Sequence, residues 1–282
     1  MAISAADVKK LREITGAGPL ECKKALEETN GDFGLAEKHL KEKGLAAVEK
    51  RLDRATNEGK IFVKLQDNRA ALAEVTTETD FVARNPEFIA VGTAIVDRIL
   101  EKGYTEIQSD LTALVTDLAT KIGENMHLKR IKLIAAGAEE YLAYYIHGDG
   151  NIGVVVKLGA DKPEVLKQEG TQEFAHTIAL HIAAFNPLAL SREKLDEVFI
   201  KEQEEMFRKQ MEQDLSMQGK PANVLENILK NKVKKYVSEI CLLDQGYVKD
   251  DNLTVAQALA ECGKNLGASL SINDYVYFKV GQ

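Results

Sequence analysis

The sequence predicts a mixed α+β fold, in which a small helical module precedes a core of strands and helices. Short apolar segments of strand length alternate with longer segments in which apolar residues recur at helical spacing. The order strand, strand, helices, strand occurs twice, in residues 60–138 and again in residues 139–282. These observations predict a duplicated two-part core, with helices segregated against each group of strands.

Composition limits the classes of protein to which the chain can belong. Its 282 residues are 45% hydrophobic, enough for one large or two modest domains, and the net charge of −7 disfavours a direct nucleic-acid partner. No apolar run is long enough to cross a membrane, and the N-terminus lacks the pattern of a signal peptide. Cys22, Cys241 and Cys262 are widely spaced and odd in number. We therefore expect a cytoplasmic protein without disulfides, metal or cofactor.

Residues 1–44 are expected to form three short helices. Ser4 begins a capping-box pattern, Pro19 stands at a favourable first helical position, and Asp32 can cap the third helix. Residues 45–59 are charged and weakly patterned, so we expect them to be a linker. A small helical module on a linker is more often a binding module than a catalytic one.

The two halves of the core have similar predicted elements. In residues 60–138 the expected strands and helices are, in order, 61–65, 70–75, 86–100, 111–122 and 128–135. In residues 139–282 the expected strands are 141–147, 152–158 and 269–280, with helices between the second and third. Weak sequence identity between the halves leaves the duplication a structural hypothesis.

The second half contains an expected helical hairpin, residues 191–240. Helical spacing extends over Ser191–Met217 and Pro221–Ile240, and the short turn between them favours an antiparallel pair. The first arm is rich in Glu and Gln, and the second contains a run of lysines. We expect opposite charges to support pairing of the arms, and the lysines to form a solvated face rather than a nucleic-acid site.

The stretch Thr76–Asn85 joins an apolar strand to the helix that begins at Pro86. Asp80 and Phe81 stand side by side in it, on an expected loop. Two interpretations are open: a turn aspartate beside a core phenylalanine, or an acidic–aromatic pair held toward a partner by two rigid elements.

Several enzyme-like patterns do not predict an active site. The glycines of 147–153 match G-x-G-x-x-G, but a strand follows them, which indicates a hairpin tip rather than a dinucleotide site. His176 and His181 are five positions apart, so they do not share a helix face as zinc ligands would. We expect one of them to be partly buried and the other to lie at the surface. Neither a P-loop nor a nucleophile elbow is present.

Several short segments together resemble one family. They are Leu11–Gly18, Cys22–Leu26, Asn30–Asp32, Thr79–Ala83, Lys121–Asn125, Gly219–Pro221 and Leu242–Gln245. In this order, and over almost the whole chain, the set is similar to bacterial elongation factor Ts. The resemblance implies a ubiquitin-associated-like module, a two-part core and a helical hairpin. It also implies a guanine-nucleotide exchange factor without covalent chemistry, which binds GDP-bound and nucleotide-free elongation factor Tu.

The resemblance also assigns partner-binding residues. Asp80 and Phe81, flanked by Thr79 and Val82, would intrude near the Mg²⁺ site of the GTPase, with Phe81 as a wedge and Asp80 fixing the loop by hydrogen bonds. The remaining implied contacts are Pro19, Leu20 and Lys23 in the module, Ile122 and Gly123, and His147 and Val248 in the second half.

Three features depart from the family pattern. Pro19-Leu20 replaces two methionines, Gly246-Tyr247 replaces Pro-Phe and is followed by Val248-Lys249, and the chain ends at Gln282 without an additional helix.

A second function is also open besides nucleotide exchange. The chain would then be a non-catalytic adaptor or dimerising scaffold that binds a GTPase, with the hairpin available for pairing with a second copy.

Overall fold

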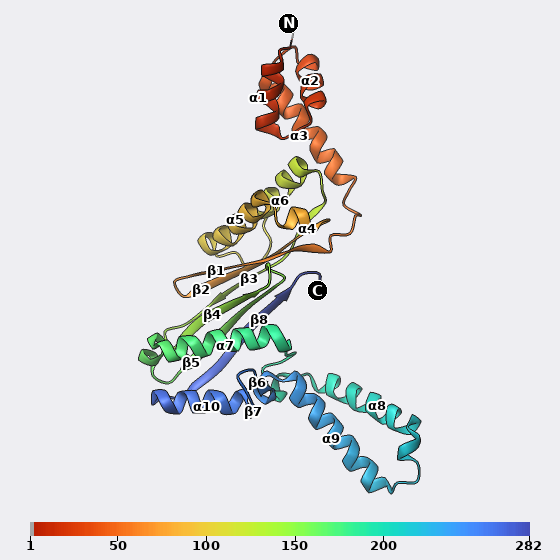
Figure 1. Ribbon diagram of the computed structural model, residues 1–282, viewed down its shortest axis with the longest axis vertical. Coiled ribbons are helices and arrows are strands. Elements are labelled where there is room, and N and C mark those ends of the chain that lie inside the picture. The colour runs from red at the N-terminus through yellow and green to blue at the C-terminus, as the bar shows by residue number, and fades with distance from the viewer. Residues whose placement is uncertain (1–2) are drawn as a thin grey trace. The chain divides into compact units, whose positions relative to one another are not determined.

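The architecture was obtained as a computed structural model that describes residues 3–282, apart from the side chains of Ala47, Glu49 and Leu215. The α+β class is confirmed (Figure 1). The chain forms two compact units, which we describe separately. The described residues of the first unit are 3–135, 146–153 and 278–282, and those of the second are 136–145 and 154–277.

The first unit begins with the expected three helices, α1 (Ala5–Thr15), α2 (Pro19–Glu28) and α3 (Phe33–Glu49). Ser4 and Asp7 form a reciprocal capping box, because each side chain accepts a hydrogen bond from the backbone N–H of the other. The Asp32 carboxylate accepts from the N–H of Leu35 at 3.0 Å. The helices enclose a small apolar core formed by Leu11, Cys22, Ala25, Leu26, Ala36 and Leu40.

Helix α3 extends beyond the predicted module. It continues to Glu49, so the first part of the segment expected to be a linker, residues 45–49, is helical. Val48 packs against the main apolar cluster of this unit, and this contact provides a reason for the helix to continue. The irregular part of the connection is residues 50–57, since the first strand begins at Glu58.

A three-stranded antiparallel sheet forms the centre of the first unit. Its order is β1 (Glu58–Gln66), β2 (Arg69–Thr77) and β3 (Met126–Ala135), and β2 lies in the middle. All residues of β2 except Arg69 are buried, which explains why its sequence does not alternate between apolar and polar. Helices α5 (Pro86–Lys102) and α6 (Ser109–Ile122) pack against the sheet (Figure 1).

A glycine permits the close approach of α5 to this sheet. A Cβ atom added at Gly92 would lie 2.1 Å from the ring of Phe62 on β1. The Phe62 ring in turn contacts Phe88, with 6.0 Å between the ring centroids. Any larger residue at position 92 would force the helix away from the strand, because cores are packed too tightly to absorb the added volume.

The second three-stranded sheet has the order β4 (Glu140–His147), β5 (Ile152–Ala160) and β8 (Leu270–Lys279). This is the same sequential order as in the first sheet, as the repeated plan requires. A short 3₁₀ helix, η1 (Pro163–Lys167), leads into α7 (Glu169–Phe185), which contacts α10 (Val255–Leu266) (Figure 1). The small hairpin of β6 (Gly246–Tyr247) and β7 (Asp250–Thr254) precedes α10.

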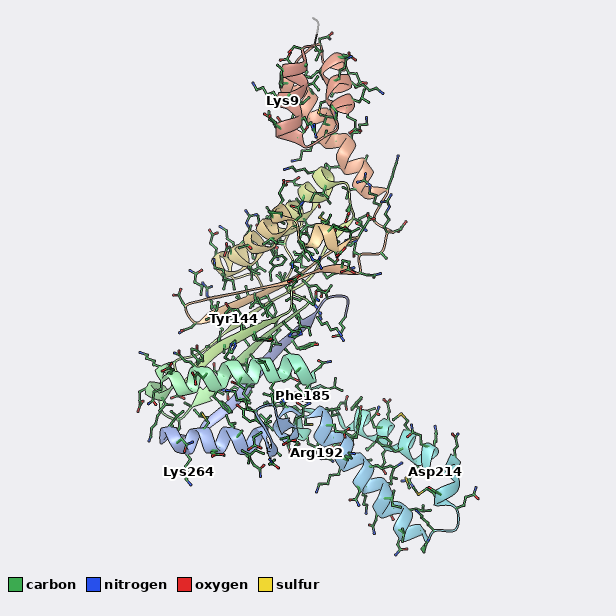
Figure 2. The ribbon with its side chains drawn as sticks, in the orientation of Figure 1. Lys9, Tyr144, Phe185, Arg192, Asp214 and Lys264 are labelled. Atoms are coloured by element: carbon green, nitrogen blue, oxygen red, sulfur yellow. The ribbon has the colours of Figure 1, made fainter. Side chains whose placement is uncertain are left out.

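The inserted hairpin consists of α8 (Glu197–Gln213) and α9 (Ala222–Ile240). The first helix is shorter than the expected Ser191–Met217, because Asp196 caps its start and 3₁₀ turns, η2 (Arg192–Lys194) and η3 (Leu215–Met217), flank it. Figure 2 shows Arg192 near one end of the hairpin and Asp214 near the other.

The hairpin arms are held by apolar rather than ionic contacts. The ring of Tyr236 lies 6.5 Å from that of Phe199 and 5.6 Å from that of Phe207, measured between centroids. Among the described residues, the hairpin's ion pairs join positions four apart in one helix, as in Arg208–Glu204. The expected pairing of opposite charges between the arms is therefore not found as a direct ion pair there, although the pKa of Asp214 at the end of α8, lowered chiefly by hydrogen bonds from Ser216, is lowered further by the charge of Lys232 on α9.

The root of the hairpin is tied by backbone hydrogen bonds and a buried histidine. The N–H of Leu188 donates to the carbonyl of Ile240 at 2.8 Å. His181 is completely buried, rather than partly buried as expected, and its Nε2 lies 3.0 Å from Gln245 Oε1. His176, five positions earlier on the same helix, is exposed as expected. Within residues 3–282, the structure contains no helix both long enough and apolar enough to span a bilayer.

Candidate functional site

The Asp80–Phe81 segment is a single helical turn, α4 (Asp80–Ala83), and not the expected loop. The Thr79 hydroxyl caps this turn by accepting a hydrogen bond from the N–H of Val82 at 3.4 Å. Val82 and Ala83 are buried, whereas the Phe81 side chain is 81% exposed. The interpretation of Phe81 as a core residue is therefore wrong. Val82 and Ala83 attach the turn to the core, and the turn presents the Phe81 ring to solvent.

The carboxylate of Glu124 braces this turn. The Thr79 hydroxyl donates to Oε1 at 2.8 Å, and the Thr79 N–H donates to Oε2 at 3.2 Å. The Thr77 hydroxyl also donates to Oε2, at 3.0 Å. The resemblance implies that Asp80 fixes the segment by hydrogen bonds, but in the structure Glu124 accepts the hydrogen bonds at its base. Lys121–Asn125 is one of the segments that resemble the family. Its local sequence, however, does not indicate that Glu124 accepts a hydrogen bond from Thr79, which lies 45 positions earlier.

Asp80 makes a different connection. Its carboxylate lies 3.5 Å from Arg84, whose Nε atom lies 3.6 Å from the carboxylate of Asp149. Asp149 belongs to the tip between β4 and β5, and its backbone carbonyl accepts a hydrogen bond from Lys60. The structure thereby brings the turn of Asp80 close to the tip that begins after His147. His147 itself is exposed at the end of β4.

The residues after α6 also bind the segment that leads from the module. The buried Asn125 donates its backbone N–H to Glu78 at 2.7 Å. Its side-chain amide donates to the carbonyls of Leu52 and Arg54, at 3.2 and 2.8 Å. Arg54 pairs with Glu78 at 3.4 Å. One corner of the fold, immediately after α6, thus contacts both the turn of Phe81 and the connection to the module.

Ile122 and Gly123 stand at the start of this corner. Ile122 is half-buried and packs on the apolar cluster of the unit. Gly123 ends α6 in the left-handed conformation, with φ 86°, which favours glycine. The sharp change of direction places Glu124 and Asn125 at their hydrogen-bond partners.

The predicted module residues lie at the start of α2. Leu20 is 73% exposed, Pro19 and Lys23 are also exposed, and Lys23 pairs with Glu27 on the same helix at 3.7 Å. This surface offers an apolar side chain and a cation beside each other. It is separate in sequence from the turn of Phe81, although the structure places both in the first unit.

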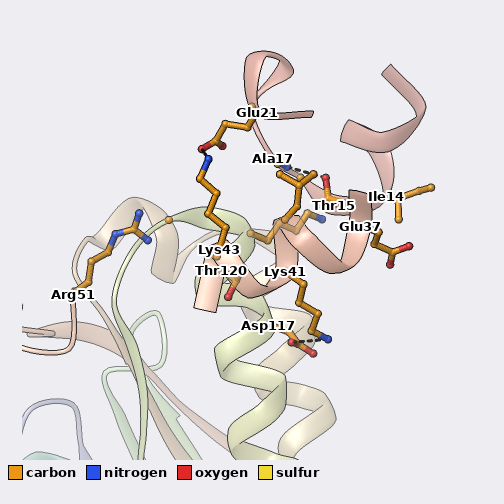
Figure 3. Close-up of a pocket in the computed structure, with 16 residues that line it drawn as sticks. Ile14, Thr15, Ala17, Glu21, Glu37, Lys41, Lys43, Arg51, Asp117 and Thr120 are labelled. Atoms are coloured by element: carbon orange, nitrogen blue, oxygen red, sulfur yellow. Dashed lines mark hydrogen bonds and ion pairs between the residues drawn. The ribbon is translucent and has the colours of Figure 1, made fainter. Parts of the chain in front are cut away.

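A cavity of about 500 Å³ lies within the first unit, between the module and α6 (Figure 3). Its lining contains the ion pairs Lys41–Asp117 at 3.5 Å and Lys43–Glu21 at 3.9 Å. Gly123 also lines it. Both signs of charge are present and partly neutralise each other, so the lining does not favour one class of charged ligand. In the described part of the chain, no group of three or more His, Cys, Asp or Glu residues is placed to hold a metal ion.

Val248 belongs to the second unit, where it lies in the turn between β6 and β7 and is half-buried. The adjacent Tyr247 packs against Phe174, with 5.9 Å between the ring centroids, and burial raises the pKa of its hydroxyl. Tyr247 is thus a buried aromatic residue immediately before Val248.

The arrangement around Phe81 suits contact with another protein. An aromatic ring that protrudes from a braced turn can enter an apolar cleft with little loss of conformational entropy, since two torsions define its position. The neighbouring carboxylates and Arg84 form a polar border around it. Such a surface resembles the aromatic anchor and polar rim of protein interfaces.

Comparison with known proteins gives a consistent result along the chain. The profile of a family described as Elongation factor TS matches residues 78–282. Elongation factor Ts of Treponema denticola is 50% identical over 281 residues, which cover 100% of this chain and 99% of that protein. The protein of the same name from Treponema pallidum (strain Nichols) is 42% identical, with coverage of 100% and 99%. That of Borrelia hermsii is 40% identical, with full coverage of both chains.

Proposed function

The chain belongs to the elongation factor Ts family, and we propose that it acts in translation elongation as a guanine-nucleotide exchange factor for elongation factor Tu. The observation that carries this proposal is the 81% exposure of Phe81 on a braced turn. An apolar ring left so exposed in the free protein is readily explained if it is buried in a partner.

We assign the roles by segment. Residues 1–44 are the partner-binding module, 45–59 connect it, and 60–138 and 139–282 are the core halves, with the hairpin at 191–240. The turn of Thr79, Asp80, Phe81 and Val82 acts near the nucleotide of the GTPase, and Ile122 and Gly123 flank it. Pro19, Leu20 and Lys23, together with His147 and Val248, extend the contact. The factor works in the cytoplasm on the GDP-bound and nucleotide-free GTPase, without nucleic acid or cofactor.

The exchange itself needs no covalent step. GDP leaves a GTPase slowly because its phosphates and the Mg²⁺ ion are held together. A protein that binds the nucleotide-free GTPase more tightly than the loaded form must weaken nucleotide binding by the same factor. A ten-thousandfold loss of GDP affinity corresponds to about 5.5 kcal/mol of differential binding. We propose that Phe81 contributes to this difference by entering the GTPase domain and displacing groups that support Mg²⁺.

The direct experiment measures release of a fluorescent GDP from elongation factor Tu, chased with excess unlabelled GDP. We expect this protein to accelerate release at substoichiometric amounts, because an exchange factor is regenerated after each event. A non-catalytic adaptor or dimerising scaffold would bind the GTPase and leave the release rate unchanged. That outcome would overturn the proposed function.

A further inference from the structure

We propose that Glu124 is a positioning residue for exchange. Its carboxylate holds the Thr79–Ala83 turn in the conformation that presents Phe81. This inference rests on the proposed function and deepens it. It assigns a role to Glu124, which is not one of the residues proposed to contact the GTPase. Glu124 acts through Thr79 and Thr77, and Phe81 remains the contact residue.

The hydrogen bonds converge on the base of the turn. Three donors meet one carboxylate, namely the Thr77 hydroxyl and both the hydroxyl and the N–H of Thr79, at 2.8 to 3.2 Å. The Thr79 hydroxyl also accepts a hydrogen bond from the N–H of Val82. A continuous chain of hydrogen bonds therefore runs from the Val82 N–H through the Thr79 hydroxyl to the Glu124 carboxylate. Hydrogen bonds to a charged acceptor are stronger than neutral ones. The carboxylate therefore fixes the capping threonine that starts the turn.

The buried Val82 and Ala83 attach the second half of the turn to the apolar cluster, but the remaining contacts are poorly suited to fix its start at Thr79 without Glu124. Helix α4 has only four residues, and an isolated helix of this length is unstable in water. The Asp80–Arg84 pair spans 3.5 Å between side chains that are 46% and 64% exposed. Exposed pairs of this kind contribute little. Phe81 cannot anchor the turn either, because its ring is mostly in solvent.

The inference predicts which kinetic parameter should change. Without the carboxylate, the turn would occupy the presenting conformation for only part of the time. The concentration of factor needed for half-maximal exchange is then multiplied by the inverse of that fraction. The exchange rate at saturation stays the same as in the wild type, because the bound factor still carries Phe81. Loss of Phe81 itself would lower the saturating rate.

The kinetic test uses Glu124→Ala and Glu124→Gln in the fluorescent GDP assay. We expect Glu124→Ala to raise the half-maximal concentration about tenfold, as for the loss of one hydrogen bond to a charged group, with the saturating rate near that of the wild type. Glu124→Gln should have a smaller effect, since its amide oxygen can still accept. The matched control is Glu101→Ala, which removes an exposed carboxylate from the far end of α5.

A spectroscopic test needs no partner. The chain contains no tryptophan, so Phe81→Trp introduces a single reporter on the turn. Adding Glu124→Ala should lower the fluorescence anisotropy of that tryptophan, and adding Glu101→Ala should not. If Glu124→Ala prevents folding, Glu124→Gln and Thr77→Val provide the same comparison with smaller changes.

The outcomes separate the two proposals. Unchanged anisotropy together with an unchanged half-maximal concentration would overturn the role of Glu124, as would a saturating rate reduced as far as by Phe81→Ala. If the wild type fails to accelerate GDP release, the proposed function is lost, and the anisotropy comparison still decides whether Glu124 positions the turn.

Discussion

Phe81 and Val82 are adjacent on one helical turn, yet Phe81 is 81% exposed and Val82 only 8%. The difference arises from where the turn is attached, since Val82 packs on the apolar cluster of the first unit and Phe81 faces outward. A substitution at Phe81 should therefore leave the fold intact, whereas one at Val82 would disturb the core. This makes Phe81 suitable for separating function from stability.

Glu74 provides a residue-scale test of how the core tolerates a charge. Its side chain is almost completely buried on the central strand, where Arg130 Nε lies 2.6 Å from Oε2 and the Gly281 N–H donates to Oε1 at 2.9 Å. Arg130 also covers the ring of Phe278, at 4.2 Å from the centroid. We expect Arg130→Ala to lower the unfolding free energy by about 2 to 4 kcal/mol, because it leaves a buried carboxylate without its cation. Denaturant unfolding measures this.

The neighbouring Lys129→Ala is the control for that experiment, because Lys129 is exposed on the same strand. We expect its effect to remain within about 0.5 kcal/mol. An Arg130→Ala variant as stable as Lys129→Ala would contradict the assigned role of the Glu74–Arg130 pair.

The residue-scale features that the sequence predicts are local ones. The caps at Ser4 and Asp32 involve partners within three positions, so their patterns are visible in the sequence. The pairing of Glu124 with Thr79 and of Glu74 with Arg130 cannot be predicted in this way, because the partners lie 45 and 56 positions apart in the sequence. The exposure of Phe81 could not be predicted from the sequence either, since a phenylalanine after an aspartate is compatible with either a core or a surface position.

At the scale of elements, the root of the hairpin depends on His181. The amide nitrogen of Gln245 donates to the carbonyl of Glu239 at 2.7 Å, which orients Oε1 toward the ring. Nε2 of His181 must then carry the proton, and Nδ1 has no hydrogen-bond partner among the described residues. The ring also stacks on Phe185, with 4.6 Å between centroids. The site accommodates neutral histidine and offers nothing for a second proton.

This geometry predicts a pH dependence of stability. Burial lowers the pKa of His181, and the hydrogen bond to Gln245 opposes the shift only in part. Below the unfolded-state pKa of about 6.5, the unfolded chain binds a proton that the folded chain refuses. The unfolding free energy should therefore fall as the pH decreases from about 7 toward 5. We expect His181→Gln to reduce this slope in denaturant titrations at several pH values.

His127 contributes with the same sign, because burial, and then Lys129, lower its pKa as well. His127→Gln is thus the parallel variant, and the double variant should have the smallest slope. A His181→Gln protein with the same slope as the wild type would show that this buried ring does not couple protonation to folding.

The elements themselves were largely predictable, but their ends were not. Apolar spacing predicts both α5 and α6. The start of α5 is indicated by Asn85 and Pro86, and the end of α6 by Gly123. The extension of α3 to Glu49 depends on Val48 reaching another part of the fold. The shorter α8 depends on Asp196 starting a new cap after a 3₁₀ turn. Tertiary contacts and competing caps decide such boundaries.

At the scale of the whole molecule, two sheets with the same sequential order support the repeated plan, and the hairpin is an insertion into the second. The order could be predicted because, in each half, two strands joined by a short turn are followed by recognisable helices and then by a third strand. The partition into two units could not, because residues 146–153 and 278–282 group with the first unit although they belong to strands of the second sheet or to their connections.

The hairpin allows a test of how function is divided. Phe199 and Tyr236 lie side by side at the base of the arms, so residues 197–236 can be replaced by a short glycine-serine linker without disturbing the root. We expect the shortened protein to fold and to keep a saturating exchange rate near that of the wild type, because Phe81 lies in the other unit. If the hairpin mediates pairing with a second copy, sedimentation will show that the wild-type dimer is lost.

The control for this excision is a full-length chain with Lys230→Ala and Lys234→Ala, which changes the exposed surface of the hairpin but keeps its packing. A shortened protein that folds but has lost its saturating rate would contradict the assignment of exchange to the turn of Phe81.

The most direct measurement of the central claim is the saturating rate of GDP release from elongation factor Tu with wild-type protein and with Phe81→Ala, alongside thermal unfolding of both. The account predicts that Phe81→Ala unfolds at the temperature of the wild type and loses most of the acceleration. An unaltered saturating rate in a folded Phe81→Ala protein would contradict the claim that the exposed ring drives nucleotide release.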